Sequence, residues 1–303
     1  MARMPFDFDD PHPTHALLLA WLVTDTPADR QRLIALHADM ATADLAEDLL
    51  ELAAGGPSYG GDREAESRFQ IQLLELAEAV AERAGAAGAL AEARRLLAAA
   101  LSDLPGSEER RIAALSLAAD AAREAARPAA IHRAEWDLAQ LLQALGRGRE
   151  AIAAYDRALD AAAAEPALTA EADETLGALV RLAAATRRAT AAKAPIRTYV
   201  AGARGAGDRT RMGHAASLAG GYLLDLGLAE EARPLLQEAT ALLGEMADDD
   251  ALARAQLRLL GLALDTGDAM AAARHLEEVL RLRDRVGDPV LAAEIEEQFG
   301  RFF

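Results

Sequence analysis

The chain has 303 residues, a formal net charge of −17 and no cysteine. The negative charge argues against nucleic acid or an anionic membrane as the main partner, since both need a basic footprint. The missing cysteines exclude disulfides, thiolate zinc sites and a cysteine nucleophile. Lys193 is the single lysine, asparagine is absent and arginine is abundant, a composition typical of a GC-rich bacterial genome.

The N-terminal residues carry no recognisable targeting or membrane signal. The apolar run at 16–23 is far shorter than the roughly 20 residues of a membrane span. Aspartates precede it instead of basic residues, which argues against a signal peptide. We therefore expect a cytoplasmic protein, with residues 1–14 as an extended lead-in rich in proline.

Residues 15–54 have the pattern of two helices broken near Thr24–Pro27, where Thr24, Asp25 or Thr26 could cap a helix and Pro27 suits a first turn. The stretch combines Thr26-Pro27, Leu33-Ile34, His37 and Thr42 through Leu50. In this order the features resemble a leader segment found ahead of repeat arrays in bacterial proteins. Such proteins often carry a CHAT-type protease or an NTPase and belong to conflict or signalling systems, although the family usually has Pro where this chain has Ala38.

Residues 55–64 contain four Gly and one Pro, which predicts a flexible linker between a leader at 1–54 and a repeat region at 65–287. Residues 288–303 begin with Asp288-Pro289, a helix cap followed by Pro at the first helical position. We expect them to form a terminal helix that covers the last apolar face of an array. The aromatic end, Phe299 to Phe303, either docks on the preceding pair or forms a contact for a partner.

The clearest pattern lies at residues 134–159. Small and large apolar residues recur at helical spacing on both sides of a turn at Gly146. They are Leu138, Ala139 and Leu142 before the turn, and Ala151, Tyr155 and Ala158 after it. Small residues at these spacings let two helix axes approach closely, and the large ones fill the remaining space.

This pattern resembles a tetratricopeptide repeat (TPR). Equivalent turns recur at Arg187, Gly227 and Gly267, in steps of 41, 40 and 40 residues. Strand signals are nearly absent, so the chain is expected to be all-α. The resemblance implies a right-handed α-solenoid of antiparallel helix pairs, with a period of about 40 residues. The repeat at Arg187 is weaker, and Pro195 should kink its second helix or delay its start.

The phase of the repeats before residue 127 stays open. Counting back 40 residues from Gly146 gives Gly106, but that choice puts Arg111 where a small residue belongs. Gly88 fits the pattern better and is out of phase with the later turns. The sequence predicts only that helices occupy 65–85, 88–103 and 107–126.

No catalytic or phosphate-binding motif is present. His37, His132, His214 and His275 are scattered along the chain. We therefore expect a non-catalytic protein without cofactor or metal.

The remaining candidate is a binding surface. In TPR arrays, the first helix of each pair lines the concave face, and matching positions of this sequence give seven polar or aromatic candidates. They are Arg133, Trp136, Gln140, Arg181, His214, Arg254 and Arg258. Four arginines on the inner face of an acidic protein suggest a basic groove for an acidic or C-terminal peptide. The alternative is that these arginines pair with Asp and Glu on neighbouring helices.

Arg254 and Arg258 resemble half of the carboxylate clamp of TPR co-chaperones. That clamp also needs asparagines, which this chain lacks, so a heat-shock chaperone tail is not expected as ligand. The leading hypothesis is a scaffold that binds another protein or peptide, and the resemblance of the leader implies a bacterial signalling or defence system. A ligand-sensing regulator and a self-assembling module, closed through the aromatic C-terminus as a homo-oligomer, are the alternatives.

Overall fold

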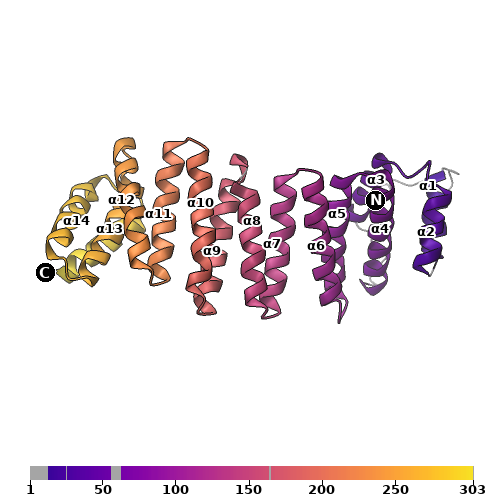
Figure 1. The fold of residues 1–303 in the computed structure, drawn as a ribbon, viewed down its shortest axis with the longest axis horizontal. Helices are drawn as coiled ribbons and strands as arrows, with labels where there is room; N and C mark the ends of the chain where they lie inside the picture. Colours follow the sequence, from indigo (N-terminus) through magenta and orange to yellow (C-terminus); the bar gives the residue numbers. More distant parts are fainter. Residues whose placement is uncertain (1–12, 25, 56–62, 164, 303) are drawn as a thin grey trace. The chain divides into compact units, whose positions relative to one another are not determined.

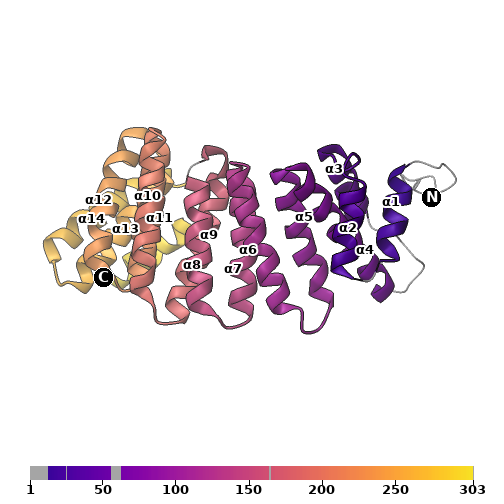
Figure 2. The same ribbon diagram turned by 45° about the vertical axis from the view of Figure 1, so that its right-hand side comes forward.

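The computed structural model describes residues 13–24, 26–55, 63–163 and 165–302, and these residues are almost entirely helical, with no strand among them. The helices fall into two compact units, residues 1–154 and 155–303. Within each unit, consecutive helices run antiparallel beside one another (Figures 1 and 2). The fold is thus all-α and built from antiparallel helix pairs, as an α-solenoid is. None of the described helices is long and apolar enough to cross a membrane.

The N-terminal unit opens with α1 (Pro13–Leu22), α2 (Pro27–Leu36) and α3 (Ala43–Gly55). The predicted break at Thr24–Pro27 is present, since the Thr26 hydroxyl accepts a hydrogen bond from the Asp29 amide at 3.2 Å. The rest of the leader is two helices instead of one, because the chain turns after His37 and restarts where Thr42 caps α3 through the Leu45 amide. Helices α1 and α2 both pack against α4 (Arg63–Ala84).

After α4 the same unit continues through α5 (Ala87–Ala100), α6 (Glu108–Glu124) and α7 (Pro128–Ala144). Each helix packs on the next, and α3, α5 and α7 also contact one another in sequence order. This places α3, α5 and α7 in one layer and α4 and α6 in the other. One apolar core runs from Leu17 on α1 to Ala122 on α6.

Helix α8 (Gly148–Ala163) crosses the division between the units. In the second unit, the first helices of the pairs are α9 (Thr169–Ala185), α11 (Arg209–Asp225) and α13 (Asp249–Asp265). The second helices are α10 (Lys193–Gly205), α12 (Ala229–Met246) and α14 (Ala269–Leu282). Helix α11 contacts both α9 and α13, so the first helices again share a layer.

The turns show a regular period of about 20 residues. Among the described residues between helices, nine have positive φ: Gly85, Gly106, Ala126, Gly146, Arg187, Gly207, Gly227, Ala247 and Gly267. A residue in this conformation ends a helix and reverses the chain. The series includes Gly106 and excludes Gly88, which lies inside α5. It therefore settles the phase that the sequence leaves open, with α5 and α6 as a pair about Gly106.

The predicted packing positions are buried in the four later repeats. About Gly146, Leu138 and Leu142 are each 4% exposed, and Ala139, Ala151, Tyr155 and Ala158 are 0% exposed. Pro195 stands in the first turn of α10, after a short 3-10 helix at Ala189–Ala192. The expected delay of that helix is confirmed, because a first-turn residue needs no amide hydrogen for the helix.

Helix α15 (Pro289–Phe302) follows the last pair and contacts α13. Leu291 and Ile295 are buried in the C-terminal core, and Phe299 packs against that core partly buried. For Phe299 the docking alternative is therefore the observed one. Residue 303, most of the predicted linker and residues 1–12 lie outside the described part of the chain, and the division after Ala154 is one that the sequence does not predict.

Candidate functional site

Two polar regions lie on the first helices, one in each unit. The first is a cavity of about 510 Å³ between α5, α6 and α7, which we call the α5–α7 cavity. It is lined by Arg95, Ala98, Ala99, Ser102, Arg111, Leu115, Asp137, Gln140, Leu141 and Ala144. The second is the set of polar side chains on α9, α11 and α13, which we call the C-terminal first-helix surface.

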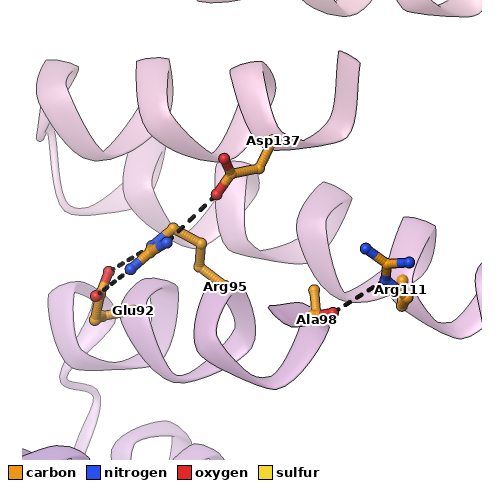
Figure 3. A network of polar contacts seen from close by, with 5 residues as sticks. All are labelled: Glu92, Arg95, Ala98, Arg111 and Asp137. Carbon is orange, nitrogen blue, oxygen red and sulfur yellow. Dashed lines mark hydrogen bonds and ion pairs between the residues drawn. The ribbon is translucent and has the colours of Figure 1, made fainter. Parts of the chain in front are cut away.

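An arginine on α5 lines the α5–α7 cavity and bonds to acidic residues on two helices. Arg95 donates two hydrogen bonds to Glu92 on its own helix, at 2.7 and 3.0 Å, and a longer one of 3.4 Å to Asp137 on α7 (Figure 3). The hydrogen bond from Arg95 lowers the pKa of Glu92, whereas burial raises the pKa of Asp137. Arg95 is therefore held firmly on the Glu92 side and loosely on the Asp137 side.

The cavity also contains an arginine from the start of α6. The Nε of Arg111 donates to the backbone carbonyl oxygen of Ala98 at 3.2 Å, while its two outer nitrogens point away from that carbonyl (Figure 3). Ala98 lies in the last turn of α5, where carbonyls have no partner within the helix. A cation there complements the negative end of the helix dipole.

The three candidates from α7 lie in the N-terminal unit. Gln140 is exposed and lines the α5–α7 cavity. Arg133 is exposed, and its charge favours the ionised forms of Glu92 and Asp137. Trp136 is half-buried and stacks on buried His132 one helical turn earlier, with ring centroids 6.3 Å apart. Trp136 thus has a packing role in α7 whatever else it contacts.

On the C-terminal first-helix surface, Arg181 of α9 is an exposed cation. Its guanidinium and the hydroxyl of Tyr222 both lie over Gly177, where a β-carbon would be 3.2 Å from an Arg181 nitrogen and 2.8 Å from the Tyr222 oxygen. Arg181 has no hydrogen bond or ion pair among the described residues. The glycine therefore gives room for two polar groups side by side.

Arg258 of α13 occupies the same kind of space one helix further along. Its guanidinium lies over Gly221, and it donates to the Ser217 carbonyl oxygen at 2.7 Å. Burial lowers the pKa of Arg258, and the charge of Asp225 opposes that shift. An arginine remains charged in this setting, so α13 carries a partly desolvated cation against α11.

The other two candidates of this unit are ion-paired. Arg254 pairs with Asp288 at the start of α15, and His214 Nε2 lies 3.0 Å from an Asp248 oxygen. Both residues belong to first helices, and their acidic partners cap the following first helix. Pairing with neighbouring acids, the alternative that the sequence leaves open, is what the structure shows for Arg254 and His214.

Sequence reasoning does not select five polar groups that lie in these regions or contact them. They are Asp173, Tyr199, Tyr222, Arg95 and Arg111. The Tyr199 hydroxyl donates to Asp173 at 2.5 Å, and burial raises the pKa of both groups. For Arg111 the sequence does contain a signal, because Arg111 is a large residue at a position where the repeat pattern has a small one. The others could not be found, because each depends on which helices are adjacent.

Among the described residues, no group of three His, Asp or Glu side chains is placed to hold a metal ion. No family model matches the chain, and no curated protein matches it.

Solved structures with similar helical folds exist, all at low sequence identity. BtubC from P. vanneervenii is 18% identical, with 79% of this chain and 91% of that chain covered and a TM-score of 0.41. RapI in its apo form is 14% identical, with 89% and 97% covered and a TM-score of 0.40. A STAND protein with a tetratricopeptide repeat sensor from Pyrococcus horikoshii is 13% identical, with 96% and 47% covered and a TM-score of 0.41.

Proposed function

We propose that this chain is a non-catalytic scaffold that binds an acidic segment of a partner protein on its first helices. The observation that carries the proposal is Arg181, an exposed arginine without an ion pair in the described chain, beside the Tyr222 hydroxyl over buried Gly177. Arginine presents several donors in a planar fork that matches a carboxylate.

The remaining first-helix candidates extend this surface along the same unit. Arg258 and Arg254 lie on α13, and the like charge of Arg254 acts on Arg258. A partner carboxylate would compete with Asp288 for Arg254. Arg254 would then exchange one carboxylate for another and would keep an ion pair. Arg133, Trp136 and Gln140 would form the corresponding surface of the N-terminal unit.

The experiment compares capture of cell proteins by the full chain and by three variants. Arg181→Glu and Arg254→Gln change the surface, and Arg274→Glu is the control, because Arg274 is an exposed arginine on the second helix α14. Proteins retained by wild type and by Arg274→Glu, but lost from Arg181→Glu, would be the partners. Circular dichroism verifies that helicity is unchanged. Equal capture by all four proteins would contradict the proposal.

A second candidate function is sensing of a small anion. The α5–α7 cavity favours it, since about 510 Å³ lined by two arginines suits a small charged molecule. A setting in bacterial signalling or defence rests on the leader segment alone. Self-assembly through the C-terminus stays a hypothesis, which the mass in solution of a chain ending at residue 297 would test.

A further inference from the structure

We propose that the α5–α7 cavity is a binding site for a carboxylate group, held by the outer nitrogens of Arg111 and the side-chain amide of Gln140. The carboxylate belongs to an acidic partner segment or to a small free acid. The inference rests on the proposed function only where the carboxylate belongs to an acidic partner segment.

The cavity exists because paired helices that pack closely in the later repeats leave a gap at the pair α5 and α6. At the position of Arg111, those repeats have fully buried alanines, each 0% exposed: Ala151, Ala192, Ala232 and Ala272. Arg111 cannot enter such a contact, since its charge would lose its hydration. It stays partly exposed at the cavity wall.

Two further positions of the same repeat are also turned outward. Ala99 and Ser102 are exposed and line the cavity. The packing positions of Ala139 and Leu142 in the next repeat are held here by Ala98 and Leu101, which are 2% and 0% exposed. Relative to the next repeat, the chain has one more residue between this packing position and the turn at Gly106, and the short 3-10 helix at Leu101–Asp103 holds it with Leu101 in the core. The arginine on α6 and the irregular end of α5 thus lie at the same opening.

The donors at the opening exceed what the fold requires. Capping Ala98 uses only the Nε of Arg111, which leaves four N–H groups on its outer nitrogens. Within the described chain, neither those nitrogens, nor Gln140, nor the Ser102 hydroxyl has a hydrogen-bond partner. A carboxylate accepts about four hydrogen bonds, which this set of donors supplies.

Asp137 is the acidic group that a bound carboxylate must tolerate. The groups acting on it are Arg95 and Glu92 from α5 and Arg133 from its own helix. Burial raises its pKa, so it takes a proton more readily than an exposed aspartate does. A second carboxylate nearby raises that pKa further, and the two can share a proton. Binding should therefore strengthen as the pH falls toward the pKa of Asp137.

Arg95 can adjust to the ligand without leaving its place. Its 3.4 Å contact with Asp137 is the longest of its three hydrogen bonds, and Glu92 keeps the guanidinium in position. A protonated Asp137 releases that nitrogen toward the cavity. Arg95 is thus a positioning residue whose donor becomes available on binding.

The test measures binding to the full chain by calorimetry with two probes, citrate and a hexaglutamate peptide, against sodium chloride of equal ionic strength. The variants are Arg111→Gln and Gln140→Leu. The control is Arg110→Gln, since Arg110 is the preceding residue of α6 but bonds to Glu75 at 2.6 Å instead of lining the cavity. We expect at least tenfold weaker binding to Arg111→Gln, several-fold weaker binding to Gln140→Leu, and no change for Arg110→Gln.

The outcomes separate the two sources of the carboxylate. Citrate binding that depends on Arg111 points to a small acid, whereas binding of hexaglutamate alone points to a partner segment. Gln140→Leu changes an exposed residue, so it remains informative if Arg111→Gln weakens the fold. Absence of binding by both probes, or equal binding by all variants, overturns the inference. The proposed function would survive that result if partner capture still depends on Arg181.

Discussion

At the scale of single residues, Arg187 has a backbone φ of 56° in a turn whose equivalents are Gly146, Gly227 and Gly267. A residue with a β-carbon pays roughly 1–2 kcal/mol for this left-handed conformation. Glycine avoids that strain but loses more conformational freedom on folding, about 0.5–1 kcal/mol. The balance favours glycine by a small margin.

We therefore predict that Arg187→Gly raises the free energy of unfolding by up to about 1 kcal/mol. Urea denaturation followed by circular dichroism measures the change, and Gly227→Ala in the same unit should lower stability by a comparable amount. A loss of stability in Arg187→Gly would mean that the arginine side chain contributes more than the strain costs.

The pKa of Asp137 gives a second prediction at this scale. Because burial raises its pKa in the folded protein, the unfolded chain releases this proton first as pH rises. The folded state therefore loses stability relative to the unfolded state from about pH 4 upward, until the folded pKa is passed.

Asp137→Asn removes this titration. We expect the variant to gain stability relative to wild type as the pH is raised from about 4 to 7, with little relative change above the folded pKa. Denaturation curves of both proteins at several pH values measure the difference. Relative stabilisation of wild type on raising the pH would show that Arg95 outweighs burial, which is the opposite sign.

At the scale of helices, two glycines in first helices have different surroundings. A β-carbon on Gly220 of α11 would lie 2.7 Å from two carbons of Leu236, which is fully buried. On Gly261 of α13 it would meet nothing within 4 Å. Both positions are helix interiors, where alanine is favoured over glycine by about 1 kcal/mol.

Gly261→Ala should thus stabilise the protein by about 1 kcal/mol, and Gly220→Ala should destabilise it, because overpacking costs about 1–3 kcal/mol. Thermal and urea denaturation of the two variants against wild type measure this pair. If both variants are stabilised, the contact between α11 and α12 can accommodate a methyl group beside Leu236, contrary to the short distances in the structure.

The sequence predicts these helices well because their signals are local. Asp288-Pro289 marks the start of the last helix through capping and proline geometry, and Asp288 accepts a backbone hydrogen bond from the Val290 amide. The pair of α5 and α6 is harder to predict from the sequence. Its irregular features, a 3-10 end and Arg111 in place of alanine, remove the pattern on which the phase depends. The same irregularities form the cavity, so the site lies where the pattern fails.

Ion pairs were less predictable than helices. Arg254 was a candidate for binding, but its pairing with Asp288 depends on α15 lying against α13. Spacing within one helix does not contain that information. Two of the capping acids, Asp248 and Asp288, therefore have a second role as partners of His214 and Arg254 on the preceding first helix.

At the scale of the whole molecule, the net charge of −17 opposes an acidic partner at long range, while Arg181, Arg254 and Arg258 attract it at contact. Salt acts differently on the two effects. The screening length falls from roughly 30 Å at 0.01 M to about 10 Å at 0.1 M salt. Repulsion between the whole molecules is then largely removed, whereas attraction between groups in direct contact, at distances well below the screening length, persists.

We therefore predict that association of the captured acidic segment speeds up as salt is raised over this range, whereas its dissociation speeds up only modestly. Stopped-flow mixing of the labelled segment with the full chain measures both rates. Steering by opposite charges gives the reverse trend, with association slowing steeply as salt rises. The Arg181→Glu variant is the matched control, since it should bind more weakly yet keep the same salt dependence of its association rate. An association rate that falls with salt would contradict the prediction, because it would mean that the arginines attract the acidic segment at long range more strongly than the net charge repels it.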